Sequence, residues 1–346
     1  MNNFIYENRT KVYFGQGCVK EFLACLVRDA GNIMLAYGQG SVKRNGIYDE
    51  VLNILMKEGK HVTEFPGIMP NPTYQKVMEG ARLAREEKTE MILGVIVTTA
   101  GTGSECNGAA VITNEEQKVK TGHDYPKCNP AFALMDPAYT FSVPGGQMVS
   151  GAFDSLSHMM ETYFSEPDEQ NVSDEISEAL MRSVIKNIRQ AVRDPKDYTV
   201  RSNLLWSSAM SENRLIKLGK RCDFACHLME HQLSAYTGCS HSQGMSVLQP
   251  VYYRHIYRDG LDKFARFARN VWMIPEEGRN REELAEAGVH ALADLIRETG
   301  LPARLREIGI KGQGQLKEIA DSCHYSPGAY RKLEAEEILE IFRECF

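Results

Sequence analysis

The sequence of 346 residues lacks several features that mark special classes of protein. It has no apolar run near the ~20 residues that span a bilayer. Its start has no basic stretch followed by an apolar one, so we expect neither a membrane segment nor a signal peptide. Basic residues do not exceed acidic ones, the net charge is −6, and no basic block occurs, which argues against a nucleic-acid partner.

Paired cysteine motifs are also absent. The nine cysteines include no CxxC pair, and Cys222 and Cys226 are spaced for one helix face rather than for a zinc knuckle. An odd number of scattered cysteines is typical of reduced thiols, so we expect a cytoplasmic protein. Hydrophobic and charged contents of 43% and 25% are those of a globular protein long enough for two domains.

The first 144 residues alternate between two patterns. Period-two or short apolar runs predict strands at 4–14, 33–36 and 61–65. Helices are predicted between and after them, near 18–29, 46–58 and 72–87. In the last helix Asn71 is the expected N-cap and Pro72 the first helical residue. This alternation is typical of a parallel α/β domain.

The rest of the chain is almost entirely helical in pattern. A turn-forming cluster at Pro144-Gly145-Gly146 separates an expected α/β domain, 1–144, from an expected all-helical domain, 145–346. Amphipathic stretches predict helices near 147–164, 171–193, 198–216, 221–237, 242–257, 260–272, 280–299, 314–323 and 334–344.

One stretch departs from the alternating pattern. Residues 91–99, MILGVIVTT, form a continuous β-prone run that is longer than the usual strand of five or six residues. In a doubly wound sheet a turn and a helix separate consecutive strands. Here two strand-like pieces, MILG and VIVTT, meet at Gly94 and Val95 with no crossover between them.

Four potential metal ligands occur in the second half. Asp154 and His158 are four apart in GAFDSLSHMMETYF, which puts both on one helix face. His227 and His241 lie in HLMEHQLSAYTGCSH, where a glycine-containing turn would bring the second to face the first. One carboxylate and three imidazoles suit Fe(II) or Zn(II) with a position open for substrate. The alternative is that these are unrelated histidines packed in helices.

The segment HLMEH permits other interpretations. H-x-x-E-H is also a metallopeptidase pattern, in which His227 and His231 would bind zinc and Glu230 would act as general base. That remote alternative leaves the other three candidate ligands and the α/β half without a role. A histidine that stands beside a metal without binding it can move protons near neutral pH, which is the role we favour for His231.

Seven motifs together point to a family. They are TKVYFGQG, LAYGQGSVKRNGIYDEV, EFPGIMPNPTY, TTAGTGSE, MDPAYTFSVP, GAFDSLSHMMETY and HLMEHQLSAYTGCSH, in that order over nearly the whole chain. With them the chain resembles the iron-containing (group III) alcohol dehydrogenases, in particular their butanol-dehydrogenase-like branch. The resemblance implies a dinucleotide-binding α/β domain followed by an all-helical metal-binding domain. It also implies a homodimer that interconverts a primary alcohol and its aldehyde with NAD(P)(H).

The resemblance assigns roles to particular positions. It implies that Fe(II) or Zn(II) is bound by Asp154, His158, His227 and His241, and that His231 relays protons near the substrate. It implies cofactor contacts at Gly38, Gln39, Gly40, Ser41, Thr98, Thr99, Thr102 and Lys120.

The turn YGQGS bears on the choice of cofactor. Its small residues would let backbone N–H groups approach a phosphate at a helix N-terminus, although such turns are common without a ligand. An acidic residue at position 39 would repel a 2′-phosphate and favour NAD. Gln39 is neutral, and Lys43 and Arg44 follow, so we expect NADP(H) to be preferred over NAD(H). The alternative for both cations is a solvated helix face.

One family feature is missing. The family carries a GGGS pyrophosphate-binding motif after the strand that corresponds to MILG, and this chain has none. A unit of roughly 30 residues or more, the size of a βαβ crossover, is therefore expected to be deleted near Gly94/Val95, which would truncate the parallel sheet. Two hypotheses follow: a working dehydrogenase whose sheet has closed over the gap, or a metal-binding relic with impaired catalysis.

Overall fold

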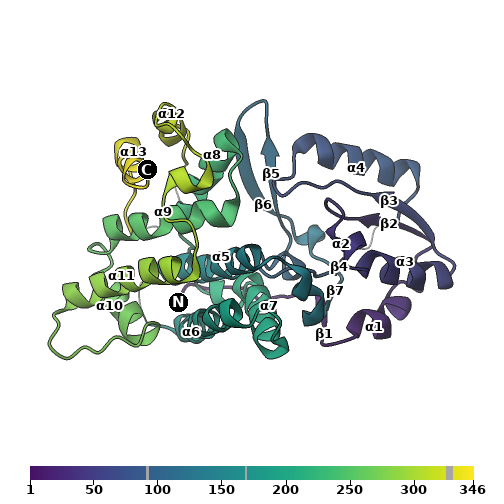
Figure 1. Ribbon diagram of the computed structural model, residues 1–346, viewed down its shortest axis with the longest axis horizontal. Coiled ribbons are helices and arrows are strands. Elements are labelled where there is room, and N and C mark those ends of the chain that lie inside the picture. The colour runs from purple at the N-terminus through teal and green to yellow at the C-terminus, as the bar shows by residue number, and fades with distance from the viewer. Residues whose placement is uncertain (91–92, 168–169, 325–329) are drawn as a thin grey trace. The chain divides into compact units, whose positions relative to one another are not determined.

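A computed structural model describes residues 1–90, 93–167, 170–324 and 330–346 (Figure 1). The chain forms two compact units. The helical unit contains residues 1–7, 100–103 and 144–346, and the α/β unit contains residues 8–99 and 104–143. The chain therefore passes between the units four times. A region of parallel strands and a mostly helical remainder confirm the predicted fold class.

The α/β unit contains two small parallel sheets. In the first, β7 (Phe132–Met135) pairs with β1 (Lys11–Phe14) on one side and with β4 (Gly94–Ile96) on the other. The second consists of β2 (Asn32–Ala36) and β3 (His61–Phe65). The helices of this unit are α1 (Cys18–Leu26), α2 (Ser41–Arg44), α3 (Ile47–Lys57) and α4 (Tyr74–Glu86). Its core packs α1 and α3 against β7 through buried aliphatic residues such as Val19, Leu55 and Leu134.

Two local predictions in this unit are wrong. The strand expected over 4–14 is confined to Lys11–Phe14, because residues 1–7 belong to the helical unit instead. Helix α4 begins at Tyr74, and its N-cap is Thr73, whose hydroxyl accepts the backbone N–H of Lys76. Asn71 is not the cap, because the carbonyl of Pro72 accepts the N–H of Thr113 at 2.9 Å and keeps the chain extended there.

The described part of the continuous β-prone run pairs with the first sheet. Met91 and Ile92 lie outside the described residues, so the structure tests only part of it. Just before them, the N–H of Glu90 donates to the carbonyl of Asn32 in β2 at 3.0 Å. Just after them, the carbonyl of Leu93 accepts the N–H of Ala131 at 2.8 Å, and β4 then pairs with β7. Gly94 and Val95 are consecutive residues of one strand.

An antiparallel hairpin completes the α/β unit and is not predicted by the sequence patterns. It consists of β5 (Ala109–Asn114) and β6 (Val119–Asp124), with Thr113 opposite Lys120. Strand β7 is also missed. Its four residues are all buried, so they show no alternation of polar and apolar side chains.

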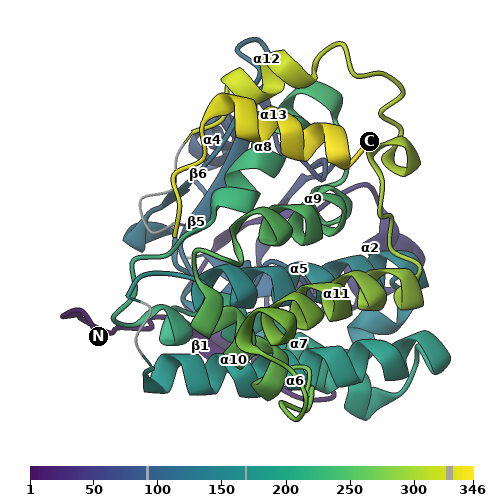
Figure 2. The same cartoon turned by 90° about the vertical axis from the view of Figure 1, so that its left-hand side faces the viewer.

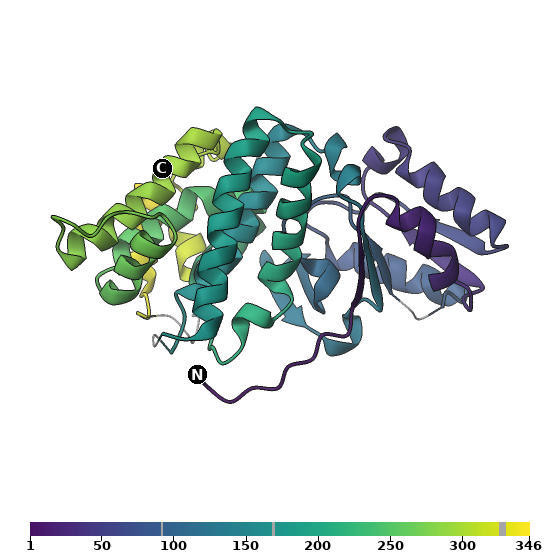
Figure 3. The same ribbon diagram turned by 90° about the horizontal axis from the view of Figure 1, so that it is seen from below.

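The helical unit confirms the nine predicted helices. Helix α5 lies at its centre and contacts α6, α7 and α9, and Figure 3 shows α5, α6 and α7 side by side. Helices α12 and α13 pack together, and Figure 2 shows them at the top of the view. The nine are α5 (Gly145–Tyr163), α6 (Val172–Arg193), α7 (Tyr198–Glu212), α8 (Ala225–Thr237), α9 (His241–Ile256), α10 (Leu261–Asn270), α11 (Arg281–Thr299), α12 (Leu316–Asp321) and α13 (Ala335–Glu344).

The interior of the helical unit contains stacked aromatic side chains and buried ion pairs. Phe164 stacks on Phe264 with ring centroids 4.0 Å apart. Asp174 of α6 forms ion pairs with Lys220, at 2.6 Å, and with Lys263 of α10, and the three side chains are at most 2% exposed. Over the described part of the chain, no helix has the length and apolar character needed to cross a membrane.

Candidate metal centre

Helices α5, α8 and α9 supply the predicted metal-site residues. Gly238, in the left-handed conformation at φ 70°, ends α8, and α9 begins three residues later. The chain therefore reverses within a short turn and returns its first α9 residue towards α8. Asp154 and His158 lie one turn apart on α5, His227 and His231 one turn apart on α8, and His241 is the first residue of α9.

Three of these side chains converge. Asp154, His227 and His241 each offer a ligand atom, and these atoms all lie within 4.8 Å of one another. Nε2 of His241 is 3.4 Å from a carboxylate oxygen of Asp154. Nε2 of His227 is buried and has no hydrogen-bond partner among the described residues. One carboxylate oxygen and two imidazole nitrogens at this spacing fit a divalent transition-metal ion.

His158 and His231 stand beside this group. The ring of His158 stacks on that of His227 with centroids 4.5 Å apart, but it is not part of the converging triad. Its Nδ1 is buried without a hydrogen-bond partner in the described part of the chain. The ring of His231 is 5.5 Å from that of His241. The structure thus clusters three of the four predicted ligands and sets the fourth against them.

Burial controls the charge of these groups. It lowers the pKa of His227 well below its usual value and also lowers that of His158. Both imidazoles therefore favour the neutral form, which is the form that binds metal. Burial raises the pKa of Glu161, which lies beside His227, to about 8.

The sequence analysis did not name Glu161, and it considered Glu230 only as the base of the metallopeptidase alternative. Glu161 of α5 contacts Nδ1 of His227, and Glu230 of α8 contacts Nδ1 of His241. Both glutamates are 0% exposed. A signal was available, because each stands three residues after a candidate histidine, in HMME and HLME. In each case the histidine that the glutamate contacts is the next candidate ligand along the chain.

Segment 100–103 packs against the helices of the metal centre. The N–H of Gly101 donates to the hydroxyl of Ser208 at 2.7 Å, and the hydroxyl of Ser155 donates to the carbonyl of Gly101 at 2.9 Å. A Cβ at Gly151 would lie 2.2 Å from the carbonyl oxygen of Ala100, so glycine is required there. Thr102, a predicted cofactor contact, is exposed within this segment.

The other predicted cofactor residues lie in the α/β unit. Gly38, Gln39, Gly40 and Ser41 form the turn from β2 into α2, with Gly40 left-handed at φ 93°. The predicted helix start is here the single turn α2, separated from α3 by Gly46. Thr98 and Thr99 follow β4, and Lys120 is buried on β6.

Lys43 is occupied within the protein. Its Nζ is 3.0 Å from Glu64 and 4.2 Å from the centroid of the Tyr48 ring. Hydrogen bonds from Tyr37, Tyr48 and Lys43 lower the pKa of Glu64 to about 2. Arg44 is exposed, as Lys43 is.

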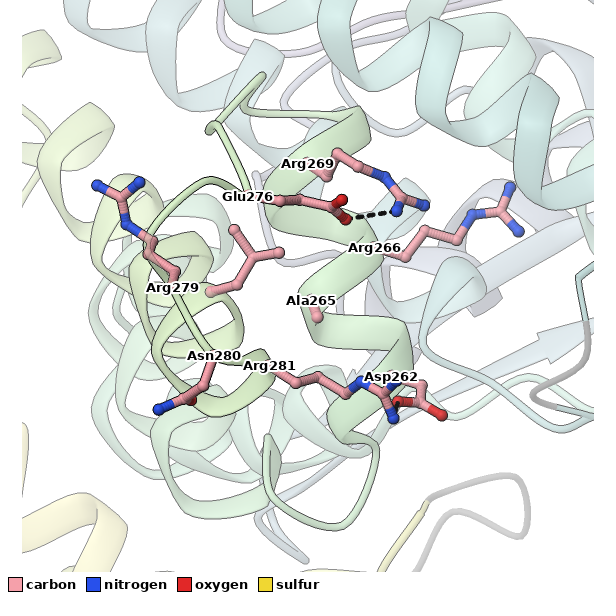
Figure 4. A pocket seen from close by; sticks show the side chains of 9 residues that line it. Asp262, Ala265, Arg266, Arg269, Glu276, Arg279, Asn280 and Arg281 are labelled. Carbon is pink, nitrogen blue, oxygen red and sulfur yellow. Dashed lines mark hydrogen bonds and ion pairs between the residues drawn. The ribbon is translucent and has the colours of Figure 1, made fainter.

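A hollow of about 400 Å³ between α10 and the start of α11 is rich in arginine but is not a competing site (Figure 4). Figure 4 marks the pair of Arg269 with Glu276. The remaining arginines also have partners, and none of the predicted site residues lines the hollow. Arg266 pairs with Glu178, Arg281 pairs with Asp262, and Arg279 donates to the carbonyl of Pro275.

Known proteins resemble this chain over its whole length. Residues 9–95 and 93–137 match the family described as iron-containing alcohol dehydrogenase, and residues 148–346 match the C-terminal part of the Fe-containing alcohol dehydrogenase family. NADH-dependent butanol dehydrogenase A of Clostridium acetobutylicum is 32% identical over 391 positions, which cover 100% of both chains. NADPH-dependent aldehyde reductase YqhD of Escherichia coli is 28% identical, and the match covers 90% of each chain.

A solved structure agrees with these matches. The crystal structure of NADH-dependent butanol dehydrogenase A from Thermotoga maritima superposes with a TM-score of 0.93 at 31% identity, covering 100% of this chain and 99% of that one. The resemblance inferred from the motifs is confirmed, and it implies a metal and a nicotinamide cofactor. The chain belongs to the iron-containing alcohol dehydrogenase family, in its butanol-dehydrogenase-like branch, and is an oxidoreductase of alcohols and aldehydes.

Proposed function

We propose that the protein interconverts short or medium primary alcohols and their aldehydes, with a divalent Fe or Zn ion held by Asp154, His158, His227 and His241. The observation that carries this proposal is the convergence of Asp154, His227 and His241 within 4.8 Å. When bound, the metal polarises the substrate oxygen and the nicotinamide cofactor exchanges hydride with the substrate carbon. Relatives named as butanol dehydrogenases and an aldehyde reductase support this substrate class.

His231 is proposed to hold and release the proton of the substrate hydroxyl. His231 is 9% exposed, and its ring lies 5.5 Å from that of His241. It is outside the triad of Asp154, His227 and His241, but with Glu230 and His241 it forms a second group whose ligand atoms lie within 4.8 Å of one another. An imidazole titrates near neutral pH, which suits a group that must both accept and donate a proton.

The cofactor is proposed to bind at the turn 38–41 and at Thr98, Thr99, Thr102 and Lys120, with NADP(H) preferred. The neutral side chain of Gln39 and the exposed cation of Arg44 support acceptance of a 2′-phosphate. Lys43 is engaged by Glu64, so Arg44 is the cation that we assign to this role. Relatives named for NADH and for NADPH both occur, so the preference is a property to be measured on this chain.

We further propose that the α/β domain, 1–144, lacks one strand–helix unit at Gly94/Val95, and that this deletion does not affect the helical domain, 145–346. The family match is split into two pieces that meet at residues 93–95. The alignment with the Clostridium protein runs over 391 positions although this chain has 346 residues. The pass of the chain from Glu90, beside β2, to Leu93, beside β7, also supports a missing strand between the two sheets.

The assembly and compartment are proposed as a cytoplasmic homodimer. All nine cysteines are free thiols, which agrees with a reducing compartment. Phe4, Ile5 and Tyr6 are 52%, 97% and 46% exposed, a run of apolar side chains suited to a second copy of the chain. Small-molecule substrates, rather than nucleic acid or membrane, are the partners that the net charge of −6 favours.

Two alternatives make different demands on the site. A metallopeptidase would need Glu230 as a base for water, but this carboxylate is fully buried against Nδ1 of His241, so the site favours the dehydrogenase. An impaired relic would keep the metal ligands and lose cofactor binding, because the missing motif removes contacts to the pyrophosphate. A charge-assisted hydrogen bond contributes about 1.5–3 kcal/mol, so the loss of two weakens binding by two to four decades.

Titration of the Zn(II)- or Fe(II)-loaded protein with NADPH, followed by fluorescence, tests the proposal. We expect saturable binding in the micromolar range and reduction of butanal by the complex. Stoichiometric metal with no NADPH binding up to millimolar concentration would leave only the relic. His241→Ala is expected to abolish metal-dependent turnover, and undiminished turnover would refute the ligand assignment.

Gln39→Asp tests the cofactor assignment. The added carboxylate would repel the 2′-phosphate, so the ratio of kcat/KM for NADPH to that for NADH is expected to fall about tenfold or more. Asn53→Asp adds the same charge at an exposed position of α3, outside the proposed cofactor contacts, and is the control. An unchanged ratio would remove position 39 from the account of specificity.

A further inference from the structure

We propose that Glu161 and Glu230 are positioning residues that fix the ring orientation and the tautomer of His227 and His241. This inference rests on the metal site of the proposed function. It concerns the side chains that contact each ligand histidine at the ring nitrogen that does not bind the metal. A metal-binding histidine must present a nitrogen without hydrogen to the ion, so the partner of its other nitrogen decides whether the site is ready to bind.

Glu161 is committed as a double acceptor. One of its oxygens accepts the backbone N–H of Cys226 at 2.7 Å and that of His227 at 3.4 Å. The other oxygen contacts Nδ1 of His227. When Nε2 of His227 binds a metal, Nδ1 carries the hydrogen, and the ionised carboxylate of Glu161 can only accept it. Nε2 then keeps its lone pair, and this is the buried nitrogen that has no hydrogen-bond partner among the described residues.

Glu230 acts in the same way on His241. Its carboxylate contacts Nδ1 of His241, and Nε2 of the same ring faces Asp154 at 3.4 Å. The side chain of Glu230 is held by close packing, because a Cβ at Gly244 would lie 2.8 Å from its Cγ. His241 therefore also directs its unprotonated nitrogen towards the ligand group.

His158 provides an internal comparison. No carboxylate contacts its Nδ1 in the described part of the chain, and it is the candidate ligand that lies outside the converging triad. The two rings with carboxylate partners are the two rings inside the triad. Within the triad of Asp154, His227 and His241, each ring is thus contacted at Nδ1 by a buried glutamate.

Each glutamate makes a prediction when changed to glutamine. In Glu161→Gln the amide oxygen must accept the two backbone N–H groups, so the NH₂ group turns towards Nδ1 of His227. His227 must then accept at Nδ1 and carry its hydrogen on Nε2, which cannot bind metal. Glu230→Gln removes the charged acceptor that contacts Nδ1 of His241.

The first experiment measures Zn(II) affinity by competition with a chelator, and Co(II) coordination by visible absorption. We expect Glu161→Gln to weaken Zn(II) binding about 10- to 100-fold and to alter the Co(II) spectrum, and Glu230→Gln to weaken binding as well. Glu178→Gln, which changes a buried carboxylate bonded to Tyr163 and Arg266, controls for the general effect of removing a buried charge and is expected to keep wild-type affinity.

The second experiment reads the tautomers directly. Nitrogen-15 chemical shifts of the metal-free protein, measured above pH 8 where Glu161 is ionised, are expected to report Nδ1–H for His227 in the wild type and Nε2–H in Glu161→Gln. An Nε2–H tautomer in the wild type, or equal Zn(II) affinity in wild type and Glu161→Gln, would overturn the inference. Failure of the wild type to bind Zn(II) at all would instead remove the metal site on which the proposed function rests.

Discussion

The buried carboxyl of Glu105 makes the stability of the folded protein depend on pH. It is 5% exposed, and one of its oxygens has no hydrogen-bond partner in the described part of the chain. Burial raises its pKa from 4.5 to about 7. As the pH rises, the folded protein therefore keeps the proton of Glu105 to a higher pH than the unfolded chain does. The stability that this raised pKa of Glu105 gives the folded protein is complete below pH 4.5 and is lost as the pH rises through 7.

Glu105→Gln should consequently stabilise the protein only at higher pH. The free energy of unfolding is expected to rise by on the order of 3 kcal/mol at pH 8, and to change little at pH 4.5. Urea unfolding at the two pH values measures this difference. Glu115→Gln, an exposed carboxyl of the same unit, is the control. An equal gain from Glu105→Gln at both pH values would contradict the assignment.

The sequence predicts that two site residues lie together when they are close to one another along the chain. Asp154 and His158 are one helix turn apart, so their shared face followed from the sequence alone. The support of His227 by Glu161 joins residues 66 positions apart, and it depends on how α5 packs against α8. The repeated H-x-x-E spacing was visible, but the sequence alone does not reveal which histidine each glutamate contacts.

Between helices, the strongest test concerns the buried ion cluster around Asp174. Removing its charge leaves Lys220 and Lys263 buried without their carboxylate, and breaking a buried ion pair costs about 3–5 kcal/mol. Asp174→Asn is expected to lower the free energy of unfolding by that amount, measured by urea denaturation. Asp294→Asn breaks an exposed pair with Arg297 and should cost less than about 1 kcal/mol. Similar losses in the two variants would show that burial does not strengthen the Asp174 cluster.

Helices were easier to predict than strands in this chain. Long amphipathic helices such as α6 and α11 repeat their apolar residues over many turns, so their periodicity is clear. Strand β7 is short and buried on both faces, and hairpin β5–β6 has only a weak alternating pattern. The cap of α4 was misplaced because a contact to Thr113, far along the chain, keeps Pro72 extended.

For the whole molecule, the exposed N-terminal run leads to a test of assembly. Ile5 is 97% exposed, and burial of such a side chain against a second copy contributes about 1.5–3 kcal/mol. Ile5→Glu is therefore expected to shift the protein towards monomer in sedimentation velocity. Val192→Glu changes another exposed apolar residue of the helical unit and should leave the assembly intact. A dimer that persists in Ile5→Glu would exclude this run from the interface.

The fold class and family could be predicted from the sequence, but the path of the chain could not. A linear pattern suggests a single boundary near residue 144. The structure instead assigns residues 1–7 and 100–103 to the helical unit. For segment 100–103 that assignment depends on close contacts at Gly101 and Gly151, and residues 1–7 include Asn2, whose N–H donates to the carbonyl of Gly219. Neither set of contacts has a periodic signature.

The four passages of the chain between the units set an order for folding during synthesis. Residues 8–99 and 104–143 leave the ribosome before most of the helical unit has been made. Segment 100–103 must wait, because the hydrogen bond from Gly101 to Ser208 spans 107 residues. At about 5–20 residues per second, that delay is roughly 5–20 s. Throughout this time the segment is linked at both ends to the α/β unit, and it can bind α5 and α7 once these helices have left the ribosome.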